Sequence, residues 1–261
     1  MLFPFSIENS SSGIVLLLLM QKIAVIVPCY NESRRIRPEE FISFMQTHSN
    51  VALIFVNDGS KDDTLSILEK INNACFSQVH IINLEKNKGK ANAIRTGLLH
   101  CAVDAELSHV GYLDADLSTS LQEFYALREA MKNENLDFVL GSRIKLMQAT
   151  IKRSFSRHII GRFIATVIDM KFRLGIYDTQ CGAKWFRREL ISELIKEPFK
   201  TKWFFDVELF LRIKNIFPLA NGKEIPLSHW SDPGKSRLNV LHFPAILADL
   251  FSLMRNYPSR K

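Results

Sequence analysis

The chain has 261 residues, of which 47% are hydrophobic and 23% are charged, an ordinary globular composition. Because no proline- or glycine-rich linker, internal repeat or low-complexity tract divides it, residues 20–261 are expected to form one domain. The net charge of +7 suits anionic partners such as phosphates or an acidic membrane surface. Nucleic acid is disfavoured, because the sequence has no zinc-finger spacing, RNA-recognition signature or basic–aromatic repeat.

Residues 1–19 are interpreted as an N-terminal extension, either disordered or a weak membrane-surface anchor. The apolar run over residues 14–20 is separated from the next one, 23–27, by Gln21 and Lys22. Neither run reaches the roughly 18 residues that span a bilayer, and no basic residue precedes the first run as in a signal peptide. Residues 23–27 are expected to be the first strand.

From that strand onward, strand-like runs alternate with helical ones. Strands are expected at residues 23–27, 51–56, 79–82, 110–113 and 137–140, and helices at 39–47, 62–72, 90–102 and 121–132. The strands are too continuously apolar to face water, so the alternation predicts an α/β fold whose mostly parallel central sheet is flanked by helices. Beyond residue 141 the pattern loosens, and we expect amphipathic helices at 154–174, 205–215 and 243–257 and a late strand at 223–227.

Two carboxylates, Asp114 and Asp116, end the fourth predicted strand. On an extended chain they point the same way, about 6–7 Å apart at ~3.3 Å rise per residue. Two like charges at the end of a buried strand repel each other, so a cation is expected between them. A hard divalent metal that also grips a diphosphate satisfies this need, because Mg²⁺ prefers one or two carboxylates plus phosphate oxygens. The alternative is a strand-end turn whose aspartates are solvated.

Polar loops follow other strands at the same predicted edge, where the ligands of parallel sheets bind. Asp58 can accept hydrogen bonds from a ribose or a base, and Gly89 with Lys90 lets a helix start approach a base or a phosphate. A turn with a helix N-cap and a plain helix entry are the respective alternatives. Rossmann cofactors and P-loop chemistry are disfavoured, because the first strand is followed by no GxGxxG and the sequence has no Walker lysine motif.

The second half of the chain adds cations and one more carboxylate. Arg143 and Arg157 can hold phosphates in a bidentate manner, with a solvated basic face as the alternative. Asp206 is interpreted as a carboxylate aimed into the cleft of the sheet, or else as an acid favoured at a helix N-terminus. Lys235 lies in a cationic loop suited to closing over a diphosphate, and surface-loop disorder is the competing explanation.

Nine ordered blocks of the sequence resemble a known family. The first half resembles the family-2 inverting glycosyltransferases of the Rossmann-like GT-A fold in IAVIVPCYNES, FVNDGSKDDT, NKGKANAIRTG and YLDADLS. The second half resembles the dolichyl-phosphate β-glucosyltransferases, and next to them the polyprenyl-phosphate sugar synthases, in GSR, RSFSR, DTQCGAKWFRRE, WFFDVEL and EIPLSHWSDPGKSRLN. The blocks extend over residues 22–257, so chance is a poor explanation.

The resemblance implies an enzyme that moves a hexose, glucose from UDP-glucose, to a polyprenyl or dolichyl phosphate. Transfer to a saccharide or other hydroxyl acceptor in cell-surface polysaccharide synthesis is the alternative, and a silent nucleotide-sugar-binding module is a weaker one. The four scattered cysteines lack CxxC pairing and match reduced thiols. The protein is therefore expected in the cytoplasm, in peripheral contact with the cytoplasmic face of a membrane.

The resemblance also implies roles for individual residues. Asp114 and Asp116 are expected to hold Mg²⁺ or Mn²⁺ against the diphosphate. Asp206 is expected near the acceptor, with Asp178 and Gln180 close by. Arg143 and Arg157 are expected to bind the donor or lipid phosphate, and Lys235 is expected to assist the departing diphosphate. The nucleotide site is expected to comprise Pro28, Tyr30, Glu32, Asp58, Lys90, Asp114 and Ala115.

Two positions depart from the family pattern. Asn57 stands where the family usually has an aspartate, which halves the aspartate pair of that loop. Ser118 stands where the mannose synthases place a glutamine metal ligand, so a third protein ligand is not supplied. We also expect none of the C-terminal transmembrane hairpins of membrane-embedded members. A lipid acceptor is then met through a basic face and amphipathic helices.

Overall fold

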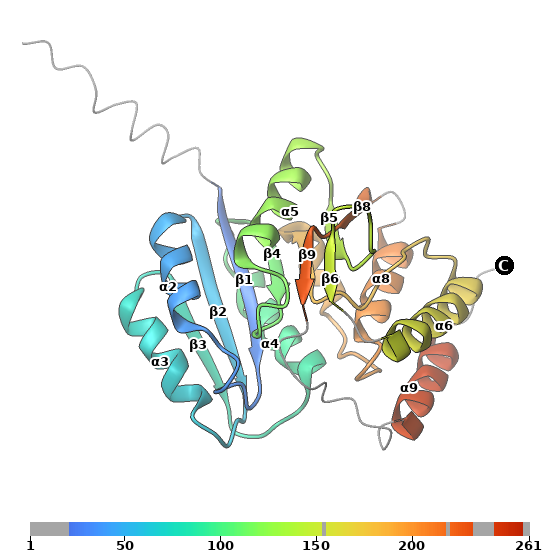
Figure 1. Ribbon diagram of the computed structural model, residues 1–261, viewed down its shortest axis with the longest axis horizontal. Helices are drawn as coiled ribbons and strands as arrows, with labels where there is room; N and C mark the ends of the chain where they lie inside the picture. Colours follow the sequence, from blue (N-terminus) through green and yellow to red (C-terminus); the bar gives the residue numbers. More distant parts are fainter. Residues whose placement is uncertain (1–20, 153–154, 218–219, 232–242, 258–261) are drawn as a thin grey trace, which may run out of the picture.

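The computed structural model describes residues 21–152, 155–217, 220–231 and 243–257, so the predicted extension over residues 1–19 lies outside the described part. Within these residues, seven strands form one sheet in the order β3-β2-β1-β4-β7-β5-β8 (Figure 1). The strands are β1 (Lys22–Cys29), β2 (Val51–Asp58), β3 (Val79–Leu84), β4 (Leu107–Leu113), β5 (Phe138–Ser142), β7 (Ala183–Arg187) and β8 (Gly222–Pro226). Neighbours in this sheet pair in parallel except where β7 meets β4 and β5, so the predicted mostly parallel sheet is confirmed.

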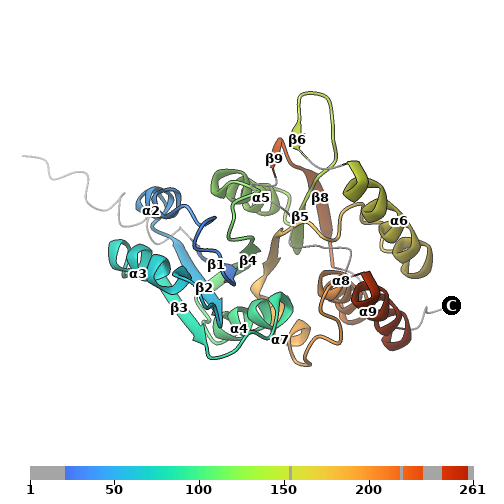
Figure 2. The ribbon, with the colours of Figure 1, turned by 60° about the horizontal axis from the view of Figure 1, so that its bottom comes forward.

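Helices cover both faces of the sheet. They are α2 (Pro38–Thr47), α3 (Thr64–Ala74), α4 (Lys90–Ala102), α5 (Leu121–Asn133), α7 (Arg188–Leu194) and α8 (Phe205–Ile216). Successive residues of a strand point to opposite faces, so Val25 and Val27 of β1 join the core under α2, α3 and α5. Ala24 and Ile26 join the core under α4, α7 and α8. Figure 2 shows α2 and α5 on one side of the sheet and α4 and α7 on the other.

Two further helices, α6 (Phe155–Phe172) and α9 (Phe243–Asn256), lie at one end of the molecule and pack on α8 (Figure 1). Phe172 of α6 and Leu253 of α9 are buried in the same apolar cluster as Leu211 of α8. The amphipathic helices predicted for the second half are therefore confirmed. None of the described helices is long and apolar enough to cross a membrane.

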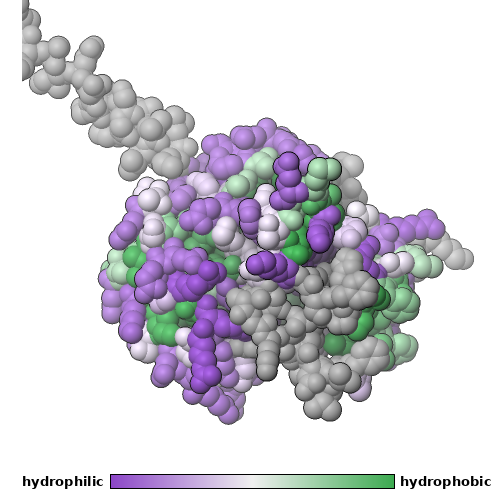
Figure 3. All heavy atoms as spheres, viewed as in Figure 1, coloured by the Kyte–Doolittle hydropathy of each residue, from purple (hydrophilic) through white to green (hydrophobic). Residues whose placement is uncertain are grey.

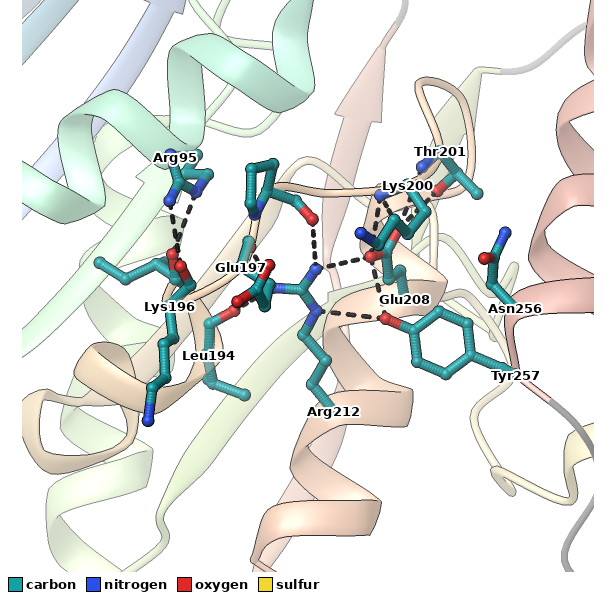
Figure 4. A network of polar contacts seen from close by, with 12 residues as sticks. Arg95, Leu194, Lys196, Glu197, Lys200, Thr201, Glu208, Arg212, Asn256 and Tyr257 are labelled. Atoms are coloured by element: carbon teal, nitrogen blue, oxygen red, sulfur yellow. Dashed lines mark hydrogen bonds and ion pairs between the residues drawn. The ribbon is translucent and has the colours of Figure 1, made fainter.

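Polar contacts also tie α9 and the residue that follows it to α8 and to the segment before α8 (Figure 4). The carboxylate of Glu208, which is fully buried in α8, accepts hydrogen bonds from Arg212 at 2.7 Å and from the hydroxyl of Tyr257 at 2.9 Å. Toward the other end, the carboxylate of Asp249 in α9 accepts hydrogen bonds from the backbone N–H groups of residues 202–204. Because several donors satisfy each carboxylate, these contacts offset the cost of desolvation and fix the start of α8.

The interior strand β7, between β4 and β5, is not predicted by the sequence pattern. Its segment carries Lys184 and Arg187, and these charges interrupt the apolar run that marks the other strands. Trp185 explains why this segment is held inside the sheet: its indole stacks on Phe124 of α5 with ring centroids 4.5 Å apart and donates its N–H to the Phe124 carbonyl. Helix α7 and the two-stranded sheet of β6 (Thr150–Lys152) and β9 (His229–Ser231) are likewise not predicted.

His109 in β4 makes folding depend on pH. It is 8% exposed, and burial, followed by the charges of Arg128 and Arg187, lowers its pKa from 6.5 to about 4. Between these values the unfolded chain binds a proton that the folded chain does not, so stability falls as the pH falls.

We expect the free energy of unfolding of His109→Gln to fall less than that of the wild type between pH 7 and pH 4.5, as measured by urea titration. The exposed His100, changed to Gln, is the control, and equal losses in the His109 variant and the wild type contradict this prediction.

Candidate active site

The carboxyl ends of β1, β2 and β4 meet the start of α4 at one edge of the sheet. Here β4 ends at Leu113 and residues 114–117 form a turn, in which the N–H of Leu117 donates to the Asp114 carbonyl at 3.2 Å and Leu117 has a φ of +50°. This corrects the expectation that both aspartates continue an extended strand, so the strand spacing does not apply to them. The pairing with β7 still reaches Asp114, whose N–H donates to the carbonyl of Gly182 at 3.1 Å, and the turn hydrogen bond of Leu117 then ends the extended conformation.

Asp114 is paired with the first residue of α4. The Nζ of Lys90 lies 2.5 Å from Oδ1 of Asp114. Burial lowers the pKa of Lys90, but the charge of Asp114, with smaller contributions from Asp206 and Asp116, raises it above its ordinary value. Gly182 leaves room for this arrangement, because a Cβ at that position would lie 2.0 Å from Oδ2 of Asp114. The ammonium group of Lys90 and the absence of a side chain at Gly182 thus position the carboxylate of Asp114.

The carboxylate of Asp116 is bound on two sides. Its Oδ1 accepts hydrogen bonds from the N–H of Ser118 at 3.1 Å and from the hydroxyl at 2.8 Å, and its Oδ2 lies 3.5 Å from Nη1 of Arg35. Burial first, and then the negative charge of Asp114, raise the pKa of Asp116 despite these partners. The two aspartates therefore repel each other, and a cation at this turn relieves the repulsion.

Asp58 holds the turn that precedes α4. It is buried, and its two carboxylate oxygens accept hydrogen bonds from the backbone N–H groups of Lys88 at 2.9 Å and Gly89 at 2.7 Å. Gly89 has a φ of +92°, a conformation that side chains with a Cβ rarely adopt. The turn brings Lys90 toward Asp114. A direct contact between Asp58 and a nucleotide stays a prediction.

The loop after β1 carries the other residues predicted to bind the nucleotide. The carboxylate of Glu32 pairs with Arg35 through contacts of 2.7 Å (Oε2 to Nε) and 2.9 Å (Oε1 to Nη2). The backbone N–H of Glu32 donates to the hydroxyl of Thr64 at 2.8 Å, which ties this loop to α3. Pro28 lies in β1 and Tyr30 follows it, so both lie at the same edge as the acidic turn.

The cations predicted to bind phosphate lie only partly within the described residues. The guanidinium of Arg143 makes two contacts of 2.7 Å with the carboxylate of Asp178 and lies 5.3 Å from the ring centre of Trp230. Arg157 belongs to the first turn of α6, but its side chain lies outside the described part, as does the whole of Lys235. The structure brings Arg143 and Asp178 together, and the roles of all three cations toward phosphate stay predictions.

Asp206 lies in the first turn of α8 and is buried. Its Oδ1 lies 2.6 Å from Nζ of Lys184 and accepts a hydrogen bond from the hydroxyl of Tyr112. Lys184 is fully buried, and its ammonium also donates to the carbonyl of Cys181. Burial first, and then the charge of Asp206, raise the pKa of Tyr112. An internal ion pair therefore sets the place of the Asp206 carboxylate, and a role toward an acceptor stays a prediction.

Three residues of this edge are missed by the sequence analysis: Arg35, Gly182 and Lys184. Arg35 lies in a dense basic segment, SRRIR, immediately after Glu32, and that juxtaposition of opposite charges is a usable signal. Gly182 and Lys184 have no comparable signal, because they reach Asp114 and Asp206 only through the antiparallel strand β7.

The donor set of the acidic turn fits one kind of metal site. Asp114 and Asp116 flank the buried Ala115 and supply hard carboxylate oxygens. Mg²⁺ is commonly bound by one or two carboxylates together with water and substrate phosphates. Among the described residues, no group of three or more His, Cys, Asp or Glu side chains could hold a metal ion. The turn therefore fits an ion held jointly with a diphosphate and does not fit a closed protein cage.

The sequence is similar to one protein family and to several known proteins. The sequence profile of Glycosyl transferase family 2 matches residues 24–195. A dolichyl-phosphate beta-glucosyltransferase of Trichomonas vaginalis is 31% identical over 243 residues, which are 87% of this chain and 69% of that protein. Another, of Dictyostelium discoideum, is 31% identical over 232 residues, which are 83% of this chain and 68% of that protein.

Solved structures share the fold. The glucosyl-3-phosphoglycerate synthase of Mycobacterium tuberculosis, crystallised with Mn²⁺, UDP and glucosyl-3-phosphoglycerate, superimposes with a TM-score of 0.68 at 17% identity. The match covers 98% of this chain and 86% of the synthase. The same synthase has also been crystallised with Mg²⁺ and UDP, and that structure has a TM-score of 0.67. The expected GT-A fold and the resemblance to family-2 glycosyltransferases are confirmed.

The buried pair of Lys184 and Asp206 predicts a coupled stability effect. Lys184→Met leaves a buried carboxylate without its cation, and we expect the free energy of unfolding in urea to fall by about 3–5 kcal/mol. Lys184→Met combined with Asp206→Asn removes both charges and should cost less than the sum of the two single changes. A double-mutant cycle measures this coupling, and strictly additive effects would contradict the assignment.

Proposed function

The chain belongs to glycosyl transferase family 2, and from this membership we propose that it transfers glucose from UDP-glucose to a polyprenyl phosphate with inversion at the anomeric carbon. Relatives named dolichyl-phosphate beta-glucosyltransferase match more than four fifths of the chain and support both the sugar and the lipid phosphate. The observation that carries the proposal is the acidic turn at residues 114–117, with the cations Lys90 and Arg35 against it at the carboxyl edge of the sheet.

On the donor side, Asp114 and Asp116 would hold Mg²⁺ or Mn²⁺, which supplies positive charge to the leaving diphosphate when it is bound. Lys90 keeps Asp114 at the edge, and its ammonium adds to the field that favours negative charge there. Asp58 orients the turn on which Lys90 depends. We assign the base, ribose and nearby phosphate to Pro28, Tyr30, Glu32, Asp58, Lys90, Asp114 and Ala115.

On the acceptor side, the fixed position of Asp206 favours a phosphate over a hydroxyl. A phosphate acceptor is already ionised near neutral pH, whereas a sugar hydroxyl needs a general base. Asp206 is bound by Lys184 and Tyr112, which suits a carboxylate that orders the site rather than one that takes a proton. We assign the donor or lipid phosphate to Arg143 and Arg157 and the departing diphosphate to Lys235.

Asp116→Asn tests the donor site. The change removes one carboxylate charge and keeps the shape of the side chain. We expect release of UDP from UDP-glucose, in the presence of Mn²⁺ and a short polyprenyl phosphate, to slow by about a hundredfold or more. Asp63→Asn, at an exposed aspartate before α3, is the matched control and should keep the wild-type rate. Near-normal turnover by the Asp116 variant would remove this residue from the donor site.

The same assay separates the candidate functions. Transfer to saccharide hydroxyls without transfer to polyprenyl phosphate contradicts the proposed acceptor while leaving the donor site intact. Binding of UDP-glucose by the wild type with no turnover on any acceptor contradicts an enzyme and supports a silent binding module.

We assign the outward faces of α6 and α9 to contact with a membrane. Phe163 and Met170 of α6 are 70% and 77% exposed and lie seven residues apart, which places them on one side of the helix. On α9, Leu247 and Phe251 are also exposed, and Figure 3 shows apolar residues gathered where these helices lie. An apolar helix face bordered by cations is typical of binding at a membrane interface. The cations near the ends of these helices are Lys171, Arg173 and Arg255.

This contact belongs, in our proposal, to the cytoplasmic face of a membrane. The four cysteines are free and buried, which is the state expected where thiols stay reduced. A nucleotide sugar is water-soluble and a polyprenyl phosphate remains in the bilayer, so an enzyme that joins them must work at the membrane surface.

Phe163→Ser combined with Phe251→Ser tests the membrane contact. Burying a phenylalanine side chain contributes about 1.5–3 kcal/mol, so we expect vesicle affinity to fall by about tenfold or more. Co-sedimentation with phosphatidylcholine–phosphatidylglycerol vesicles measures this affinity. Phe76→Ser is the matched control, because Phe76 is 78% exposed but lies between α3 and β3. Equal binding by the double variant and the control contradicts the assignment of this surface.

A further inference from the structure

Two arginines of the loop between β1 and α2 contact the acidic turn after β4. Nη1 of Arg35 lies 3.5 Å from Oδ2 of Asp116. Nη2 of Arg37 donates to the carbonyls of Asp116 at 3.3 Å and Leu117 at 3.1 Å. One arginine therefore contacts the side chain of Asp116 and the other contacts its backbone. The loop after the first strand thus restrains a turn that lies about eighty positions further along the chain.

The backbone of this turn needs such support. Leu117 has a φ of +50°, which is uncommon for a residue with a branched side chain and costs of the order of 1 kcal/mol. The hydrogen bond from Arg37 to the Leu117 carbonyl and the turn hydrogen bond to the Asp114 carbonyl hold this conformation. The direction of the Asp116 side chain then follows from the backbone of the turn.

Arg35 lies between the carboxylates of Glu32 and Asp116 and binds Glu32 more closely. Its Nε and Nη2 pair with both oxygens of Glu32 at 2.7 and 2.9 Å, which is the bidentate geometry that guanidinium groups favour. Its remaining nitrogen reaches Asp116 at 3.5 Å, beyond the range of a good hydrogen bond. Glu32 therefore anchors the guanidinium, and the contact with Asp116 is mainly a charge interaction that can be exchanged for another cation.

We infer that Arg35 is a positioning residue that balances the charge of Asp116 until a divalent cation binds, and that it does so while held by Glu32. The inference rests on the proposed function, in which Asp116 holds that cation. Arg35 and the ion then compete for one carboxylate. Because Arg35 stays on Glu32, the same side chain keeps the nucleotide loop in place when the ion arrives.

Three substitutions separate charge from geometry. Arg35→Gln removes the competing charge, so we expect Mn²⁺ without nucleotide to bind about 3- to 10-fold more tightly. It also removes the bidentate partner of Glu32, so UDP in saturating Mn²⁺ should bind about tenfold more weakly. Arg35→Lys keeps the charge and loses the fork, so only the UDP affinity should fall. Arg34→Gln, at the exposed neighbouring arginine, is the matched control and should change neither affinity.

The free Mn²⁺ signal in electron paramagnetic resonance measures the metal affinity at constant pH, and calorimetry measures the UDP affinity. Tighter metal binding together with weaker UDP binding in Arg35→Gln supports the inference, since a merely structural role would weaken both. Unchanged or weaker metal binding in that variant overturns it. Asp116→Asn separates a failure of the proposed metal site from a failure of the role inferred for Arg35. If that variant binds Mn²⁺ like the wild type, the proposed metal site itself is wrong, and this inference falls with it.

Discussion

The antiparallel pairing of β7 with β4 is the constraint on which the candidate site depends. It holds the end of β4 in place, because the N–H of Asp114, just beyond the last strand pair, donates to the carbonyl of Gly182 in the same register. The absence of a side chain at residue 182 then leaves space for the Asp114 carboxylate, which a Cβ would meet at 2.0 Å. Two residues further along β7, Lys184 reaches Asp206 in α8. One strand thus places a carboxylate of the donor turn and the carboxylate proposed for the acceptor side.

Three aspartates of this region each have a cationic partner, but the pairs differ in how easily a ligand could replace one partner. Lys184 and Asp206 are buried together, so water cannot replace either partner and the pair serves the fold. Lys90 and Asp114 are each 38% exposed at their side chains, which leaves their contact open to solvent and to a ligand. Arg35 and Asp116 lie between these extremes, at 23% and 17%. The exchangeable pairs are therefore those of the acidic turn, where a diphosphate and its ion would have to enter.

The sequence predicts the parallel half of the sheet well, because its strands are continuous apolar runs and its helices are amphipathic. It also predicts that residues after β1, β2 and β4 share an edge, since the ends of parallel strands meet there. It does not predict β7, whose Lys184 is charged yet fully buried, because the ion pair that permits this burial joins residues 22 positions apart. The extended spacing of Asp114 and Asp116 is wrong for a local reason: residues 114–117 form a turn directly after β4, with Leu117 at a φ of +50°.

Helix α8 links the proposed membrane surface to the site without a flexible connection. Nζ of Lys214 in α8 donates to the Phe172 carbonyl at the end of α6, and Nζ of Lys171 in α6 donates to the Met254 carbonyl near the end of α9. With Asp249 holding the backbone before α8, the three helices brace one another. The first turn of α8 carries Asp206, which accepts a hydrogen bond from Tyr112, one residue before the end of β4. Because these contacts are continuous, the orientation of α6 and α9 on a bilayer would also set the orientation of the acidic turn relative to that bilayer.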